Sequence, residues 1–139
     1  MTYCLDTNIC IYFLTGRYPA LYDILMSSSP KDIKIPSIVK AELLHGAEKS
    51  AKPDETKEKL KPFLFPFEIV PFGDDAAQQY AVHKARLEKA GMFIGSNDLI
   101  IAATALSIQA VLVTNNEREF SRIDGLSLEN WTLPASPAR

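Results

Sequence analysis

The sequence contains few cysteines and no excess of positive charge, and these two features exclude some classes of function. The 139 residues include two cysteines, Cys4 and Cys10, with no CxxC pair. We expect two small buried side chains rather than a disulfide or a cysteine metal site. The formal net charge of -2 argues against a broad basic surface that grips nucleic acid non-specifically. Nucleic acid is still a possible substrate, because bound metal ions supply positive charge locally.

Long apolar runs and targeting signals are also missing. No apolar run is long enough to span a bilayer, and Asp6 interrupts the first apolar stretch, which no basic segment precedes. We therefore expect no membrane contact, no signal peptide and a cytoplasmic location. The length and the 47% hydrophobic content suit one domain with a core, which we place at residues 1–133, followed by a short tail at 134–139.

Strand-like and helical segments alternate along the chain. Runs at residues 2–5, 32–35, 67–72 and 110–114 predict strands, and residues 126–133 predict a last edge strand. Helices are predicted at residues 7–16, 21–28, 37–51, 53–64, 74–91 and 96–109, with a helical turn at 115–120. We expect helix caps near Asp6 or Thr7, at Ser37 and near Ser96. The alternation predicts an α/β sandwich around a parallel sheet.

Three carboxylates occupy segments that otherwise look like core. Asp6 follows the first strand, Glu42 lies about one turn into the helix after the second, and Asp98 opens an apolar helix. Parallel sheets bind ligands beyond the carboxyl ends of their strands, so these acids can meet at one sheet edge. Taken singly, Asp6 and Asp98 are explained equally well as a helix cap and a helix-dipole partner.

A shared divalent cation would resolve the repulsion between such neighbouring carboxylates. Without a cation, one of the carboxylates would be pushed toward protonation. Mg²⁺ and Mn²⁺ prefer oxygen ligands of this kind. Such an ion supports the hydrolysis of a phosphodiester, and the helix N-termini near Thr7 and Ser96 would add backbone donors for a phosphate.

Four stretches of the sequence resemble the motifs of one known family. They are LDTNICIYFL at residues 5–14, IPSIVKAELLHGAEKS at 35–50, IGSNDLIIAATALS at 94–107, and LVTNNEREF at 112–120 followed by GLSLENW at 125–131. Their order and context are similar to those of PIN-domain ribonucleases, specifically the VapC-type toxins of bacterial toxin–antitoxin pairs. The resemblance runs from Leu5 to Trp131 and implies a three-layer α/β/α sandwich with a mainly parallel sheet.

The same resemblance implies an activity and partners. Members of the family are Mg²⁺- or Mn²⁺-dependent endoribonucleases that leave a 5′-phosphate and a 3′-hydroxyl, and their acids fall on Asp6, Glu42 and Asp98 here. They are usually homodimers and are neutralised by a cognate antitoxin whose C-terminal segment blocks the site. The motif variant in this chain is most similar to the subgroup that cuts the anticodon stem-loop of initiator tRNA.

One position departs from the family pattern. Many PIN domains carry a fourth acid where this chain has Asn116. An amide oxygen can still bind a metal, but it brings no negative charge, so a second ion would bind weakly or only with substrate. Glu119 or Glu117 could replace the acid, and Thr114 could hydrogen-bond the water or a carboxylate.

Other polar residues near the motifs are candidates for supporting roles. Asn8 and Asn97 could orient Asp6 and Asp98, although each equally suits a turn or a cap. The candidate RNA contacts are Lys40, His45, Lys49 and Arg118. Plain solvent exposure is our preferred explanation for all of them except Arg118.

Three other functions compete with a ribonuclease. The first is a catalytically inactive PIN domain that only binds RNA or protein, and the retention of three acids argues against it. The second is a phosphatase or phosphoacceptor domain, which would need a second aspartate in LDTN and a lysine near a late strand. The third is a structure-specific DNA nuclease of the wider group, which would need a larger chain.

Overall fold

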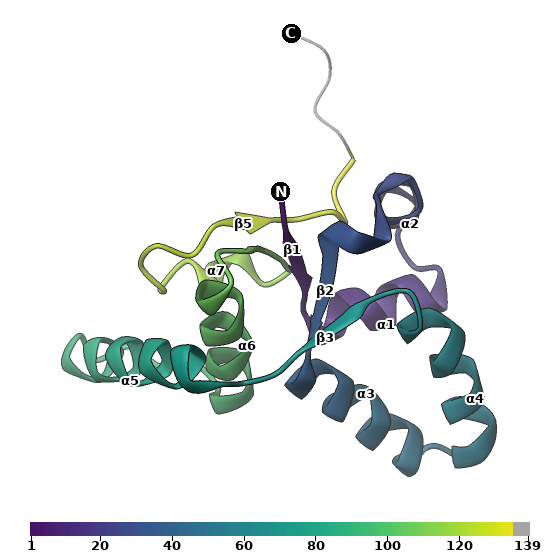
Figure 1. Cartoon of the computed structure of the whole chain (residues 1–139), viewed down its shortest axis with the longest axis horizontal. Helices are drawn as coiled ribbons and strands as arrows, with labels where there is room; N and C mark the ends of the chain where they lie inside the picture. Colours follow the sequence, from purple (N-terminus) through teal and green to yellow (C-terminus); the bar gives the residue numbers. More distant parts are fainter. Residues whose placement is uncertain (135–139) are drawn as a thin grey trace, which may run out of the picture.

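Five parallel strands form the centre of the molecule (Figure 1). A computed structural model describes residues 1–134. The sheet has the order β3-β2-β1-β4-β5, and every neighbouring pair is parallel. Its strands are β1 (Tyr3–Leu5), β2 (Ile33–Pro36), β3 (Glu68–Val70), β4 (Val111–Val113) and β5 (Leu128–Glu129). The predicted α/β fold with a parallel sheet is confirmed.

Helices flank this sheet on both sides (Figure 1). They are α1 (Thr7–Thr15), α2 (Pro19–Ser27), α3 (Ser37–Lys49), α4 (Pro53–Leu64), α5 (Asp74–Lys89), α6 (Ser96–Ser107) and α7 (Glu117–Phe120), with a 3-10 turn at Pro30–Asp32. The chain moves outward from β1 to β3 and then returns past β1 to β4. Right-handed crossovers therefore place α1–α4 on one face and α5–α7 on the other. Within residues 1–134, no helix has the length and apolarity to cross a lipid bilayer.

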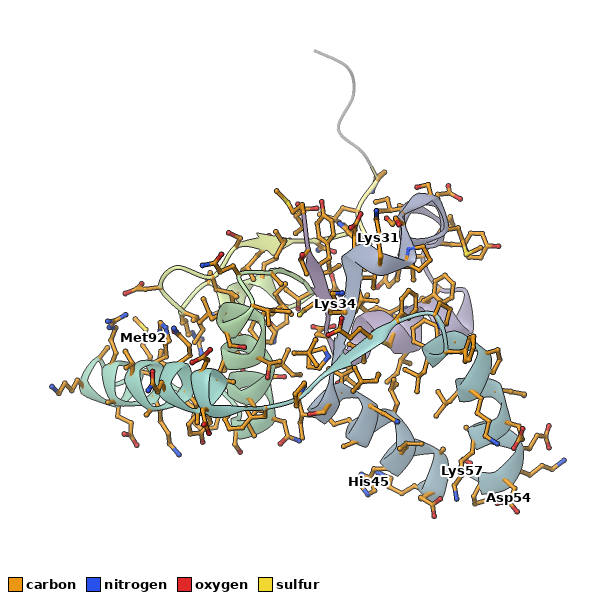
Figure 2. The ribbon with its side chains drawn as sticks, in the orientation of Figure 1. Lys31, Lys34, His45, Asp54, Lys57 and Met92 are labelled. Atoms are coloured by element: carbon orange, nitrogen blue, oxygen red, sulfur yellow. The ribbon has the colours of Figure 1, made fainter. Side chains whose placement is uncertain are left out.

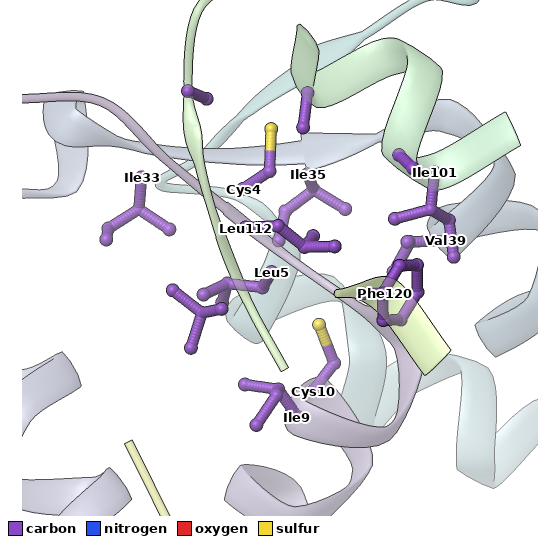
Figure 3. Packing of buried hydrophobic residues seen from close by; sticks show 14 of the residues in the cluster. Cys4, Leu5, Ile9, Cys10, Ile33, Ile35, Val39, Ile101, Leu112 and Phe120 are labelled. Atoms are coloured by element: carbon purple, nitrogen blue, oxygen red, sulfur yellow. The ribbon is translucent and has the colours of Figure 1, made fainter. Parts of the chain in front are cut away.

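The core is built around the central strand (Figure 3). Cys4 and Leu5 of β1 are fully buried together with Ile35 of β2 and Leu112 of β4. The side chains of β4 are apolar along its whole length, because helices cover both faces of a parallel sheet. In β2, the charge of Lys34 is paired with Glu68 of the neighbouring strand β3. Both cysteines are free and buried, as expected. The register pairs Leu5 with Val113, so β1 and β4 end side by side.

Helix caps were predicted with mixed success. Asp6 does cap α1, since its Oδ1 accepts a hydrogen bond from the Ile9 backbone N–H at 2.9 Å. The cap expected at Ser37 is wrong, because Ser37 is already the first residue of α3. The cap expected near Ser96 is the preceding residue, Gly95, which has no side chain to form a capping hydrogen bond. Pro36, the last residue of β2, stands in the cap position of α3, so no loop residue is left to supply a polar side chain.

The C-terminal part of the chain also differs from prediction. Only Leu128 and Glu129 of the expected edge strand at 126–133 pair with β4. The chain then turns, and the Asn130 side chain accepts hydrogen bonds from the backbone N–H and the hydroxyl of Thr132. Of the expected tail at 134–139, residues 135–139 lie outside the described part of the chain.

Candidate active site

Asp6 lies at the carboxyl end of the central strand. Its backbone N–H donates to the Val113 carbonyl at 3.2 Å, and its side chain is 6% exposed. Burial raises the pKa of this carboxyl, and the negative charge of Glu42 adds to the shift, whereas the Thr114 hydroxyl and the Ile9 N–H act in the opposite direction. The chain therefore holds a carboxylate here whose charge it only partly compensates.

Glu42 reaches the same edge from α3. Its Oε1 accepts a hydrogen bond from the Thr7 hydroxyl at 2.6 Å, and its Oε2 accepts one from the Asn97 side chain at 3.3 Å. These bonds fix Glu42 between the first turns of α1 and α6. Asn97 therefore binds Glu42 and not Asp98, the acid that it was predicted to orient, and the contact between Thr7 and Glu42 was not predicted from the sequence. The available signal was a hydroxyl directly after Asp6 in the LDTN motif.

Asp98 lies in the first turn of α6, beside Glu119. Its burial is the largest of several causes that raise the pKa of Asp98 to about 6, and the adjacent carboxylate of Glu119 is the next. The negative charges of Asp6 and Glu42 contribute further in the same direction. The four carboxyl groups therefore influence one another at one edge of the sheet. The alternation of strands and helices predicts the same edge for Asp6, Glu42 and Asp98.

Glu119 is held by donors from two segments. Its Oε1 accepts from the Gly95 backbone N–H at 3.1 Å, and its Oε2 accepts from the Asn116 side chain at 2.9 Å. Burial opposes ionisation of Glu119, but these two bonds, a hydrogen bond with Asp98 and the charge of Arg122 outweigh it and lower its pKa. Glu119 therefore ionises more readily than Asp98. The sequence makes Glu119 a candidate replacement for the fourth acid but does not predict that it lies next to Asp98.

The remaining predicted site residues lie around this cluster. Thr114 is fully buried, and its hydroxyl accepts from the Asn116 backbone N–H at 2.9 Å. Arg118 and Glu117 are exposed on α7. Asn8 is exposed on α1, and within residues 1–134 its side chain makes no hydrogen bond to Asp6 or any other group.

The chemistry of the cluster fits a hard divalent cation. Asp6, Glu42, Asp98 and Glu119 offer carboxylate oxygens, and the Asn116 amide adds a neutral oxygen. Burial first, and repulsion from neighbouring carboxylates second, raises the pKa of Asp6 and of Asp98, and a bound cation would offset both effects. Across residues 1–134, no three His, Cys, Asp or Glu side chains already converge as closely as ligands of one ion. Instead, several of these carboxylates bind backbone N–H groups and side-chain donors.

Residues 3–126 match the PIN domain. The chain belongs to the PIN-domain family. The expected family is thus confirmed, and the three-layer α/β/α sandwich agrees with it.

Relatives within the family carry the name VapC. Ribonuclease VapC2 of Rickettsia felis is 43% identical over 132 residues, which cover 94% of this chain and 98% of that protein. The tRNA(fMet)-specific endonuclease VapC of Shigella flexneri is 33% identical over 132 residues, which cover 95% of this chain and 99% of that protein.

Solved structures of PIN-domain proteins agree with this fold. The crystal structure of VapBC2 from Rickettsia felis bound to a promoter DNA fragment contains a chain that matches with a TM-score of 0.88 and 42% identity, covering 94% of this chain and 99% of that one. The crystal structure of DNA-bound VapBC from Salmonella typhimurium contains a chain that matches with a TM-score of 0.89 and 33% identity. The match covers 94% of this chain and 98% of that one.

Proposed function

We propose that this PIN-domain chain is an endoribonuclease toxin that hydrolyses RNA phosphodiesters with Mg²⁺, for which Mn²⁺ can substitute. The observation that carries the proposal is the meeting of Asp6, Glu42 and Asp98, which come from three separate parts of the chain, at one sheet edge. There, Thr7 and Asn97, the sequence neighbours of Asp6 and Asp98, both hydrogen-bond Glu42. Relatives named ribonuclease support the proposal. In this role Asp6, Glu42 and Asp98 are the catalytic carboxylates.

Asp6, Glu42 and Asp98 would hold the ion, with the Asn116 amide oxygen and Glu119 as further proposed ligands. Such an ion lowers the pKa of a water and offsets charge on the scissile phosphate. Thr7 and Asn97 orient Glu42 by binding both of its oxygens. No side chain caps α6, so its first backbone N–H groups can bind a phosphate. Thr114 stabilises the Asp6 carboxylate.

We propose tRNA as the RNA substrate, with the anticodon loop of initiator tRNA as the preferred target. The motif variant of this chain and the name of the Shigella flexneri relative support this choice. Recognition of an RNA loop depends on unstacked bases that a protein can stack and hydrogen-bond. Arg118, exposed two residues after Asn116, is a proposed RNA contact.

We further propose that a cognate antitoxin binds the chain, that the chain forms a homodimer, and that it acts in the cytoplasm. Complexes of related VapBC pairs support the antitoxin. Helices α1 and α2 expose apolar side chains that a partner would cover. Their exposed fractions are 41% for Ile11, 38% for Leu14, 49% for Tyr22 and 61% for Met26.

Incubation of the purified chain with total bacterial RNA tests this function. The samples contain Mg²⁺, Mn²⁺ or a chelator, beside an Asp98→Asn variant, and new 5′ ends are mapped by sequencing. We expect one dominant cut in the anticodon loop of initiator tRNA, absent with chelator and in the variant. A discrete cut elsewhere would retain the ribonuclease and reject the tRNA target. Intact RNA in every folded, metal-supplied sample would favour the inactive binding domain.

A further inference from the structure

Helix α3 presents three different faces to its surroundings. One face is buried in the core, and a second, with Lys40 and Leu44, lines an apolar groove beside α4. The third face follows the spacing i, i+4, i+7 and i+11, which places side chains in one row along a helix. This row consists of Ile38, Glu42, His45 and Lys49, and it borders an open groove.

This groove begins at the proposed active site. It has a volume of about 380 Å³, and Thr7 and Asn97, the two residues that hold Glu42, line it together with the α3 row. Gly46 adds no side chain to it, and a Cβ built there would meet nothing within 4 Å. With a rise of 1.5 Å per residue, His45 lies about 5 Å and Lys49 about 10 Å along the helix axis from Glu42.

The two side chains at the outer end of the groove, His45 and Lys49, take no part in the polar contacts described within residues 1–134. His45 and Lys49 are both exposed. Within residues 1–134, neither makes a hydrogen bond or an ion pair, whereas Lys57 and Lys61 of α4 pair with Glu48 and Glu58. Figure 2 shows His45 projecting from α3 on the side away from α4. The groove therefore offers an aromatic ring and a cation to a ligand.

We propose that this groove, bounded by Thr7, Asn97 and the α3 row, binds the single-stranded RNA that flanks the cleaved bond. Lys49 binds a backbone phosphate, and the His45 ring stacks on an unstacked base. This inference rests on the proposed ribonuclease function. A cation near the acids but beyond their contacts attracts the RNA backbone without neutralising the metal site, and aromatic stacking suits any base.

Direct binding measurements test the groove without requiring cleavage. The full chain carrying Asp98→Asn is titrated with a fluorescent anticodon stem-loop RNA at several salt concentrations. Adding Lys49→Gln is expected to weaken binding about tenfold and to reduce the slope of log K against log salt by about 0.7. Adding His45→Ala is expected to weaken binding, and His45→Phe is expected to restore it, because a phenyl ring also stacks.

Lys40→Gln is the matched control, because it removes the same charge from another face of α3. Its expected binding equals that of the Asp98→Asn parent. Equal effects of Lys49→Gln and Lys40→Gln, or unchanged binding by Lys49→Gln, would overturn the proposed groove. The latter would also be the result if a protein segment fills the groove. Failure of the wild-type chain to cut RNA would instead count against the proposed ribonuclease and leave the binding result interpretable.

Discussion

Asp98 carries a charge that the folded chain tolerates poorly at neutral pH. Its pKa is raised to about 6 from an ordinary value of 3.8, because it is partly buried among other carboxylates. Above the folded pKa, ionised Asp98 therefore destabilises the native state relative to the unfolded chain. Below the unfolded value both states are protonated and the penalty disappears.

This penalty predicts that Asp98→Asn stabilises the metal-free chain. At pH 8 in chelator, the free energy of unfolding is expected to rise by about 1 kcal/mol after allowance for solvent screening, which raises the Tm by a few degrees. The difference is expected to shrink as the pH falls through 6 and to vanish near 4. Thermal unfolding of both proteins across this range measures it. Equal Tm values at pH 8 would contradict the uncompensated charge.

The Thr7 hydroxyl predicts a second effect at the residue scale. Thr7→Val removes the donor to Glu42 Oε1 and leaves that carboxylate less well oriented. RNA cleavage is expected to slow about tenfold through kcat, with the fold intact by circular dichroism. Thr15→Val is the control, because its hydroxyl binds only backbone carbonyls at the exposed end of α1. Equal cleavage rates for the two variants would show that Thr7 has no positioning role.

The positions of single residues were predictable only where the strands determine them. Asp6, Glu42 and Asp98 could be assigned to one edge, because each follows a strand or lies in the first two turns of a helix whose direction the alternation predicts. The position of Glu119 could not be predicted, since it depends on the orientation of a four-residue helix and on the Gly95 N–H from a segment 24 residues earlier. Such contacts arise from tertiary packing and leave no periodic signal.

At the scale of elements, periodicity predicted the type of each segment better than its ends. The almost wholly apolar stretch after Asp98 is a buried helix, α6, whose Leu99, Ile101, Ala102 and Ala105 are at most 3% exposed. The predicted caps of α3 and α6 nevertheless differ from the structure by one residue, since Pro36 and Gly95 stand in the cap positions. A proline or glycine in the cap position carries no side-chain hydrogen bond that a sequence pattern could reveal.

The packing of α6 predicts that small residues are required on its buried face. Ala105→Leu adds three carbons at a site with no exposed surface, and overpacking of this kind costs about 1–3 kcal/mol. The Tm is expected to fall by several degrees. Ala81→Leu in α5 is the control, since Ala81 is exposed and leucine is also a good helix former. Thermal denaturation compares the two variants, and equal Tm values would show that the core around α6 can accommodate the larger side chain.

At the scale of the whole molecule, a cation bound by acids from separate elements would link those elements. A ligand that binds only the native state stabilises it according to its concentration over its dissociation constant. Because Asp6, Glu42 and Asp98 come from segments far apart in sequence, the proposed Mg²⁺ site exists only in the folded chain.

Added Mg²⁺ is therefore expected to raise the Tm of the wild-type chain. At about ten times the dissociation constant the gain is about 1.4 kcal/mol. Asp98→Asn is expected to show a smaller shift or none at the same concentrations, and chelator is expected to reverse the effect. Differential scanning calorimetry measures both proteins. An identical rise in the two would indicate a general salt effect rather than binding at this site.

Because β1 lies at the middle of the sheet, the sheet around it is completed only after the C-terminal strands have been synthesised. Asp6 is synthesised almost first, but the register beside it is completed only by β4, whose Val111 pairs with Tyr3. The Asp98 and Glu119 carboxylates also come late in the chain. A ribosome that stops before β4 therefore releases a fragment that contains three of the four acids, without Glu119, and has no assembled site. Under the proposed function, a growing chain would stay inactive until the residues beyond β4 have been added and the sheet has closed around β1.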